Sequence, residues 1–423
     1  MRTFLSKGAF AFCLSAIVAT ASAQEELVGA LAYSVIKKLD NGVEVRNGGF
    51  GSAMTGHPLK PNHFYVLTDR GPNVDFDGPE GKGKKFPVPG YSPRIAEVER
   101  LGNGELRIVR TLTLHAPGGE PITGLPNPEG MGATGETPYD YAGRVLRFDP
   151  YGLDPEGIAA LKDGGFWVSD EYGPHIVHYS SAGYELERLN PFGTGAGGRK
   201  LPKVFANRRP NRGMEGLAIT PDEQRLVGVM QSTLFNPSKK AVKNKALTRI
   251  LTLDIATGET HQYLYRQEAD NLSNSEIAAI SKDEFLMVER DGGFAGEKAK
   301  YKRLYKIDLR GATDVSGDFD SQTGMQINGK ALEELSWDEL AAAGVQPVRK
   351  TLVVDLLAQM NYPHDKLEGL WIMGANKVAV INDDDFAVAE QNGNVAQKII
   401  PATGRVDANT LYVIDLENPL SSD

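Results

Sequence analysis

The chain repeats a short pattern of apolar and polar positions several times. In each copy a short apolar stretch is followed by a turn, and then by a second apolar stretch that ends on carboxylates. Four copies are clear, at residues 155–171, 214–231, 275–291 and 367–383, and a weaker one lies at 49–70. Short apolar runs separated by turn residues are typical of antiparallel strands. The pattern therefore predicts an all-β chain built from repeated strand pairs.

A further strand follows in most copies, with an Asp between apolar positions and then a turn. It is clearest at residues 249–258, 303–311 and 410–416. A set of strands that recurs every ~40–60 residues indicates the blades of a β-propeller. The five repeats account for five blades, and the irregular stretch 103–152 or the chain ends can supply another. We therefore predict an all-β, six-bladed β-propeller.

One step in the repeat is longer than the others. The step from Glu276 to Glu368 is 92 residues, whereas the two preceding steps are 59 and 61 residues. Within it, Ser336 followed by Glu339 is a capping box, which begins a helix. The extra length therefore predicts a short helical insertion near residues 331–343.

The first 23 residues have the features of a cleavable export signal. Arg2 and Lys7 precede an almost wholly apolar stretch, and residues 21–23 read Ala-Ser-Ala, which suits a signal peptidase. The apolar stretch is shorter than the roughly 20 residues that span a bilayer. We therefore expect a signal peptide at residues 1–23, a single domain at residues 24–423, and a periplasmic or secreted protein.

Composition narrows the class of partner. The formal net charge is −9, and the only cysteine, Cys13, lies inside the predicted signal. The exported chain therefore has no disulfide or thiolate chemistry, and its acidity argues against binding to nucleic acid. No other segment of the sequence is long and apolar enough to span a membrane. We expect a monomer whose partner is a small anionic molecule, met by cations or by local basic residues.

Carboxylates recur at matching positions of the repeat. In a propeller such positions surround one axis, so their side chains gather at one end of the channel. The predicted metal ligands are Asp69, Glu156, Asp170, Glu215, Glu276, Asp291, Glu368 and Asp383. Carboxylates in such number stay ionised together only beside cations, and oxygen ligands without His or Cys favour Ca²⁺. The alternative, that each glutamate caps a turn or accepts backbone N–H groups, stays open.

Basic residues lie beside these carboxylates. The guanidinium fork suits phosphate oxygens, so cations and arginines around one pocket allow an acidic protein to bind a phosphate ester. The predicted catalytic residues are Arg70, Arg290 and Glu171, and the predicted substrate-binding residues are Arg212, Lys366 and His175. The sequence motifs of α/β-hydrolases, zinc peptidases and P-loop nucleotide-binding proteins do not occur.

Several motifs resemble those of one known family. They are Asp69-Arg70-Gly71-Pro72, Pro155-Glu156-Gly157-Ile158, Val168-Ser169-Asp170-Glu171, Met214-Glu215-Gly216-Leu217 and Leu367-Glu368-Gly369-Leu370. Together, across residues 45–416, the chain resembles the phytase-like family, which is often described as having esterase-like activity. The resemblance implies an exported bacterial propeller hydrolase that acts on phosphate esters with calcium. The copy at residues 275–277, Ser-Glu-Ile, departs from the Glu-Gly pattern.

Three functions fit this pattern. The leading hypothesis is a calcium-dependent phosphoesterase, in which the carboxylates hold the ion and Arg70 and Arg290 clamp the phosphoryl oxygens while water attacks. The chain is also similar to six-bladed gluconolactonase-type propellers that hold one metal with Glu, Asn and Asp. Glu156, Asn382 and Asp383 match those ligands, which implies a lactonase or carboxylesterase. The third hypothesis is a non-catalytic binding propeller with structural calcium.

Overall fold

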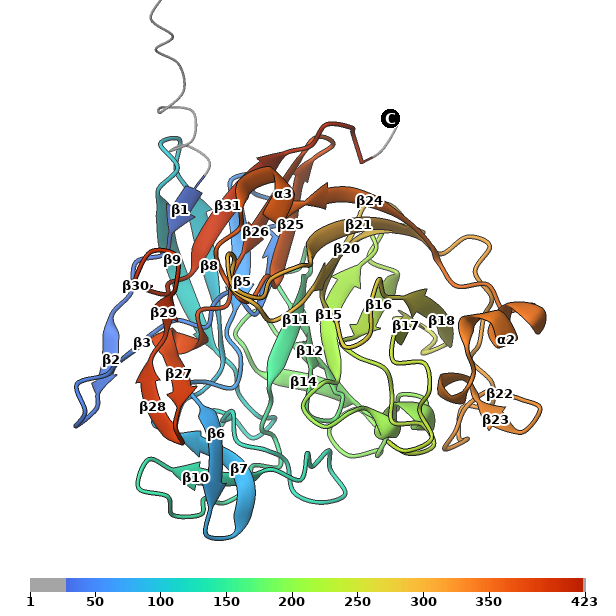
Figure 1. The fold of residues 1–423 in the computed structure, drawn as a ribbon, viewed down its shortest axis with the longest axis horizontal. Helices are drawn as coiled ribbons and strands as arrows, with labels where there is room; N and C mark the ends of the chain where they lie inside the picture. Colours follow the sequence, from blue (N-terminus) through green and yellow to red (C-terminus); the bar gives the residue numbers. More distant parts are fainter. Residues whose placement is uncertain (1–27, 421–423) are drawn as a thin grey trace, which may run out of the picture.

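The structure is a computed structural model that describes residues 28–420 and consists mainly of β-strands (Figure 1). The predicted signal peptide lies outside the described residues. The helices within residues 28–420 are short: η1 (Lys203–Asn207), η2 (Leu332–Glu334), α2 (Trp337–Ala342), α3 (Leu356–Met360) and η3 (Asp385–Ala387). None of the described helices has the length and apolar character needed to cross a membrane.

Five four-stranded antiparallel sheets form the body of the described chain. The first contains β4 (Ala53–Gly56), β5 (His63–Leu67), β8 (Arg94–Arg100) and β9 (Leu106–Thr113). The second contains β11 (Pro155–Ala160), β12 (Phe166–Asp170), β13 (Ile176–Tyr179) and β14 (Glu185–Leu189). The third contains β15 (Met214–Ile219), β16 (Arg225–Met230), β17 (Leu247–Asp254) and β18 (Thr260–Arg266).

The last two sheets each include a strand that is distant in sequence. The fourth contains β19 (Ser273–Ala279), β20 (Glu284–Arg290), β21 (Lys302–Asp308) and β24 (Arg349–Asp355). The fifth contains β25 (Gly369–Gly374), β26 (Lys377–Ile381), β31 (Thr410–Asp415) and β1 (Val28–Ala30). The fifth sheet therefore pairs the first described strand with the last one.

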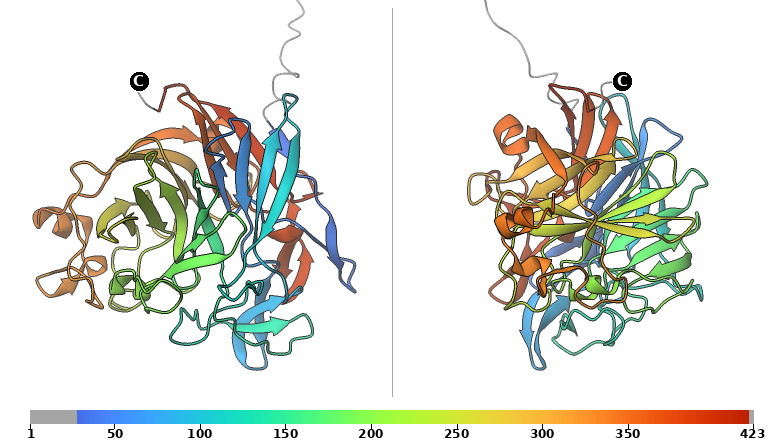
Figure 2. Two further views of the ribbon diagram at one scale, coloured as in Figure 1. Left: turned by 180° about the vertical axis from the view of Figure 1, so that it is seen from behind. Right: turned by 90° about the vertical axis from the view of Figure 1, so that its right-hand side faces the viewer.

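The first strands of the five sheets meet around a centre. Strand β4 contacts β11, β11 contacts β15, β15 contacts β19, β19 contacts β25, and β25 contacts β4 again. Views from several sides show the sheets spreading outward from these strands, the arrangement of a β-propeller (Figure 2). The expected sixth blade is not found within residues 28–420. The stretch 103–152 supplies β9 and peripheral loops, and the described N-terminal end completes the fifth sheet.

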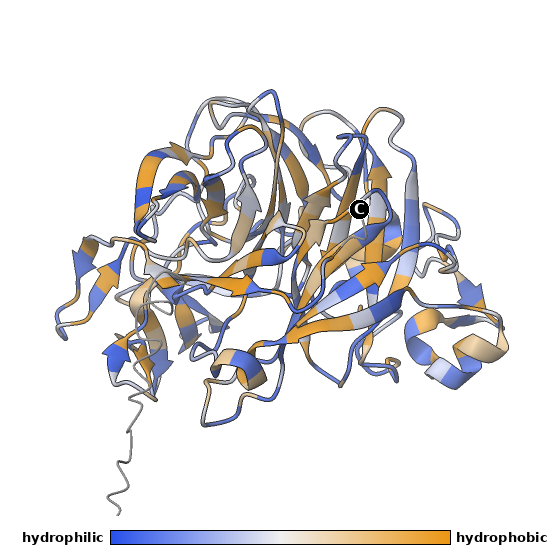
Figure 3. Cartoon of the chain, turned by 90° about the horizontal axis from the view of Figure 1, so that it is seen from above, coloured by the Kyte–Doolittle hydropathy of each residue, from blue (hydrophilic) through white to orange (hydrophobic). Residues whose placement is uncertain are grey.

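Each pair of neighbouring sheets is joined by its own apolar core. In the second sheet, Ile158 and Phe166 pack with Tyr65 of the first sheet, whereas Ala159 and Trp167 pack toward the third sheet. Successive side chains of a strand point to opposite faces, so one strand serves two cores. Figure 3 shows the resulting alternation of hydrophobic and hydrophilic positions along the strands. Three further cores join the remaining neighbours, including the fifth sheet to the first.

Smaller sheets extend from the five main ones. Near one end of the ring lie β6 (Val74–Gly78), β7 (Gly81–Phe86), β10 (Thr137–Asp140), β27 (Val388–Gln391) and β28 (Asn394–Gln397), as Figure 1 shows at the bottom of the view. The remaining short strands are β2 (Val35–Lys38), β3 (Glu44–Arg46), β22 (Gln326–Ile327), β23 (Lys330–Ala331), β29 (Ile399–Ile400) and β30 (Arg405–Val406).

The predicted helical insertion is confirmed. It lies between β21 and β24 and includes α2, whose N-cap is Ser336. The Ser336 hydroxyl accepts the Glu339 N–H at 3.2 Å, and the Glu339 carboxylate accepts the Ser336 N–H at 2.8 Å. Leu335 and Leu340 lie in one buried cluster, as a hydrophobic staple requires.

Candidate functional site

An acidic pocket of about 410 Å³ lies where the first strands of the sheets begin and the second strands end. Ten carboxylate and six Lys or Arg side chains line it, so acidic groups exceed basic ones. Most of the sequence-predicted residues meet here: Asp69, Arg70, Glu156, Glu171, Arg212, Glu215, Arg290, Lys366 and Glu368. The recurrence of carboxylates in the repeat therefore marked a real spatial cluster.

A β-bulge in the first strand of a sheet aims its glutamate at the pocket. The pairing register of β11 with β12 shifts at Glu156, and that of β15 with β16 shifts at Glu215. The next residue is a glycine because neighbouring first strands approach closely there. A Cβ added to Gly157 would lie 2.7 Å from the Leu217 nitrogen, and one added to Gly216 would lie 2.8 Å from the Glu276 Cα.

The bulge also corrects the expected alignment of the fourth sheet. In β19 the shifted residue is Ser275, so Ser275 matches Glu156 and Glu215, whereas Glu276 matches the glycines. The Glu276 carboxylate accepts the N–H groups of Met54, Leu217 and Ile277 at 3.4, 3.3 and 2.9 Å. It does not line the pocket. The expectation that Glu276 joins the other glutamates is not met.

Three more predicted residues are not brought to the pocket. Asp170 accepts the N–H groups of Asp154 and Gly173 at 2.7 and 2.8 Å, so it fixes a turn. Asp291 accepts three backbone N–H groups of the loop after β20 and the Lys302 ammonium at 2.9 Å. His175 is buried with its Nε2 3.0 Å from the Asn127 side-chain oxygen, and burial holds its pKa well below the usual value.

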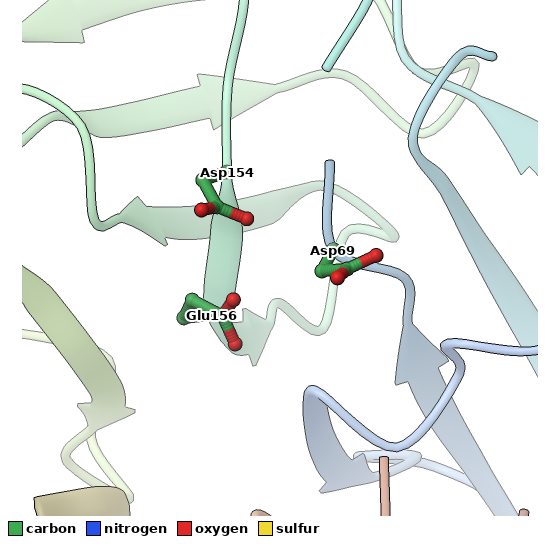
Figure 4. A group of neighbouring side chains, drawn as sticks. All are labelled: Asp69, Asp154 and Glu156. Carbon is green, nitrogen blue, oxygen red and sulfur yellow. The ribbon is translucent and has the colours of Figure 1, made fainter. Parts of the chain in front are cut away.

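Asp69, Asp154 and Glu156 form the first acidic triad (Figure 4). Each offers one carboxylate oxygen, and these oxygens lie within 4.8 Å of one another. Glu156 is only 6% exposed and has no hydrogen-bond or ion-pair partner among residues 28–420. Its pKa is raised well above the usual range, first by burial and then by the charges of neighbouring carboxylates, Asp154 foremost. A cation is the partner that this triad lacks.

The other two members of the first acidic triad are partly satisfied. One Asp69 oxygen accepts the Gly71 N–H at 2.9 Å. Asp154 accepts the Arg70 backbone N–H at 3.2 Å, and its second oxygen lies 3.4 Å from the Arg70 Nε. Sequence reasoning missed Asp154. The sequence feature that could have identified Asp154 is its position two residues before Glu156, directly before β11.

A second acidic triad shares Asp69 and adds Asp383 and Asp385, with ligand oxygens again within 4.8 Å. Here a lysine is already present, because the Lys366 ammonium lies 2.6 Å from Asp383 and 2.8 Å from Asp385. Lys398 bonds the other Asp385 oxygen at 2.6 Å. Asp385 is the second residue that the sequence pattern did not reveal. Asp383 lies behind Lys366 rather than on the pocket wall.

The three pocket arginines differ in their pairing. Arg70 contacts Asp154 and Glu136, each at 3.4 Å. Arg290 donates to the Ser275 hydroxyl at 2.9 Å and pairs with Glu368. Arg212 donates only to the hydroxyls of Ser232 and Ser273, at 3.1 and 3.3 Å, and no carboxylate of the described chain lies within 4.0 Å of its guanidinium. Arg212 is therefore the pocket arginine with charge left for an anionic ligand.

Glu171 and Glu215 face each other across one amide. The Gln231 side-chain nitrogen donates to Glu171 at 2.5 Å and to Glu215 at 2.7 Å. Burial, and then the charge of Glu215, raise the pKa of Glu171 well above its usual range. Glu171 therefore keeps its proton to a higher pH than an exposed glutamate does.

Asn382, the residue that matches the gluconolactonase-type ligand set, is used inside the fold. Its side-chain oxygen accepts the Thr410 N–H at 2.7 Å, and its amide donates to Asp407 at 3.2 Å. It does not line the pocket. The Glu-Asn-Asp set of the alternative hypothesis is therefore not gathered at the pocket.

The fold and the pocket together define a class: a propeller-like β protein with an acidic site, able to hold a metal ion, at one end of its central ring. Within that class, the chain belongs to the phytase-like family. The family model, "Esterase-like activity of phytase", matches residues 45–386. The family supports hydrolase activity, and the buried acidic groups are an arrangement that can bind a metal.

One curated relative is similar over part of its length. It is a protein of Arthroderma benhamiae described as "Uncharacterized secreted protein", 27% identical over 275 residues, which are 54% of each chain. The chain therefore spans about half the length of that relative.

Solved structures show only distant likeness. The PQQ-bound aldose sugar dehydrogenase of Streptomyces coelicolor has a TM-score of 0.33 at 13% identity, over 88% of this chain and 85% of that one. Virginiamycin B lyase of Staphylococcus aureus has a TM-score of 0.30 at 11% identity, over 87% and 97%.

Proposed function

We propose that this protein is an exported, calcium-dependent hydrolase that cleaves a small anionic ester, with a phosphate ester favoured. The observation that carries the proposal is Glu156, a buried carboxylate without a partner, directed at the same space as Asp69 and Asp154. Leaving such a charge uncompensated costs several kcal/mol. A bound cation removes that cost.

Calcium fits the donors. The first acidic triad supplies only carboxylate oxygens, and neither His nor Cys lines the pocket. Hard oxygen donors select Ca²⁺ or Mg²⁺, and Ca²⁺ accepts irregular, partly buried carboxylate sets more readily. When bound, the ion supplies Lewis-acid polarisation of an ester oxygen. Asp69, Asp154 and Glu156 would hold it.

The remaining pocket residues divide the other tasks. Arg212 binds the anionic group of the substrate, because its guanidinium has no carboxylate partner among the described residues. Arg70 and Arg290 hold the surrounding carboxylates in position. Glu171, whose pKa is raised by burial and by the charge of Glu215, keeps its proton to a higher pH than an exposed glutamate and is suited to donate it to the leaving alkoxide. The ester is therefore met by positive charge on one side and by a proton donor on the other.

The proposal extends to location and assembly. The sequence-predicted signal peptide and the secreted relative both support export, to the periplasm or the medium. A small anionic substrate fits a pocket of about 410 Å³. We further propose that the protein acts as a monomer. We also propose that it does not bind nucleic acid, because its formal net charge is −9.

Hydrolysis assays test the proposal. We expect phytate or a simple phosphomonoester to be hydrolysed in Ca²⁺, with activity lost in chelator and restored by added Ca²⁺. Glu156→Gln should lower kcat/KM by about 100-fold or more. The matched control is Glu80→Gln, an exposed glutamate in the turn between β6 and β7, which should behave like wild type.

Substitution of Arg212 separates binding from catalysis. Arg212→Gln should raise KM for an anionic ester by about 10-fold or more while calcium affinity stays unchanged. Activity on lactones or carboxylic esters but not on phosphate esters would show that the substrate is not a phosphate ester. If no ester is turned over although calcium binds, the protein is a binding propeller and the proposal fails.

A further inference from the structure

The two acidic triads share Asp69 but differ in the cations already beside them. In the first acidic triad, Glu156 has no partner among residues 28–420. In the second, Asp383 and Asp385 each contact a lysine ammonium at 2.6–2.8 Å. These lysine distances are close to the roughly 2.3–2.6 Å at which carboxylate oxygens bind Ca²⁺. The second acidic triad therefore already has the cationic contacts that an ion would provide.

Lys366 is fixed at this position by its surroundings. Its backbone N–H donates to the Asp365 carboxylate at 2.9 Å, and its carbonyl accepts the Tyr362 hydroxyl at 2.9 Å. The ammonium lies between Asp383 and Asp385 and is 4.0 Å from Glu368. The side chain is 26% exposed and lines the pocket, with its ammonium held against Asp383 and Asp385.

Lys398 also contacts Asp385, at the carboxylate oxygen that Lys366 does not contact. Its side chain is 3% exposed, and its ammonium lies 2.8 Å from Asp365 and 2.6 Å from Asp385. Two ammonium groups thus lie against Asp383 and Asp385, whereas the cation that lies within 4.0 Å of the first acidic triad among the described residues is Arg70, whose Nε is 3.4 Å from Asp154; the Lys366 charge acts on Asp69 and Glu156 only from farther away. Of the two acidic triads, the first is therefore the one to which an added cation would bind.

We propose that the centre binds one divalent ion, at Asp69, Asp154 and Glu156, and that the Lys366 ammonium takes the place of a second ion at Asp383 and Asp385. This inference rests on the proposed function, in which the first acidic triad holds calcium. It assigns Lys366 as a built-in counter-charge that excludes a second metal. Its ammonium is engaged by Asp383 and Asp385, so it is a positioning residue and not a direct substrate ligand.

Calcium stoichiometry tests the inference on the full exported chain. Equilibrium dialysis or isothermal titration with Ca²⁺ alone should give one ion per wild-type chain. Lys366→Gln removes the charge and frees Asp383 and the Asp385 oxygen that Lys398 does not contact, so this variant should bind two ions. Lys366→Arg keeps the charge and should still bind one. Two ions in wild type, or one ion in a folded Lys366→Gln variant, would overturn the inference.

A second comparison covers the case in which Lys366→Gln does not fold. Asp385→Asn should weaken calcium binding less than about fivefold, whereas Glu156→Gln should weaken it at least about 30-fold, because only Glu156 is a ligand. A loss for Asp385→Asn as large as that for Glu156→Gln, or larger, would show that Asp385 is also a ligand and overturn the inference. Absence of any calcium binding to wild type would instead defeat the proposed function itself.

Discussion

Glu156 and Glu276 belong to two copies of the same repeat and are both buried, yet they serve different regions of the molecule. Glu156 is the bulged residue of its strand and faces the acidic pocket without a partner among the described residues. Glu276 lies one position further along and binds three backbone N–H groups in the channel. The residues that donate them, Met54, Leu217 and Ile277, line a pocket at the opposite end of the first strands.

The difference teaches that burial and recurrence do not identify a ligand. A carboxylate such as Glu276 has hydrogen-bond partners for its oxygens and contributes to the fold, although burial raises its pKa well above the usual range. One that accepts none, at the same depth, is costly unless something else binds it. The number of unsatisfied acceptors, and not the number of acidic residues, therefore separates the pocket from the channel.

The largest expected effect is on stability. Glu276→Ala leaves three buried N–H groups without an acceptor, so we expect the unfolding free energy to fall by about 3 kcal/mol. Glu156→Gln in calcium-free buffer should change it by less than about 1 kcal/mol, because burial raises the pKa of Glu156 well above its usual range, so one uncharged side chain replaces another and no hydrogen bond is lost. Urea denaturation measures both. A loss of stability at Glu156 as large as that at Glu276 would contradict the distinction.

The next effect is on pH dependence in the pocket. Burial, together with Asp383 and Glu215, raises the pKa of Glu368 to about 8, despite the opposing charges of Lys366 and Arg290. The folded chain therefore binds more protons than the unfolded chain between pH 5 and pH 8, and this group makes stability fall as pH rises. In calcium-free buffer, the drop in Tm from pH 5 to pH 8 should be about 2 °C or more smaller in Glu368→Gln than in wild type. Thermal denaturation of both proteins checks this, and parallel Tm curves would refute it.

The smallest expected effect concerns a carboxylate of the same repeat outside the pocket. Asp291 is satisfied by three backbone N–H groups and Lys302. Asp291→Asn should therefore leave the calcium Kd within about twofold of wild type, although the loop after β20 is loosened. Isothermal titration measures the Kd. A tenfold loss would show that the channel and loop carboxylates contribute to the metal site after all.

Much of the architecture could be predicted from local patterns in the sequence. Alternating apolar positions gave the strand pairs of all five sheets, and the capping box at Ser336 and Glu339 gave α2. The number of blades could not be predicted from these patterns, because the described N-terminal strand β1 completes the fifth sheet instead of starting a new one. A pairing between two ends of a chain leaves no local pattern.

The pocket residues that could be predicted from the sequence are those at matching positions of the repeat. Glu156, Glu215 and Glu368 occupy matching positions and meet as expected. Asp154 and Asp385 were missed, because what identifies them is proximity to Asp69, from which they are distant in sequence. Glu276 was misplaced because a bulge moves the register by one residue, and a one-residue shift sends a side chain to a different environment.

The pairing of β1 with β31 has a consequence for biogenesis. Val28–Ala30 finds its partner only when Thr410–Asp415 is present, so the fifth sheet is the last to be completed as the chain emerges. Contacts this far apart in sequence also form slowly. The ring of five sheets therefore closes only after Thr410–Asp415 has been synthesised, so a shorter chain lacks the final closed form.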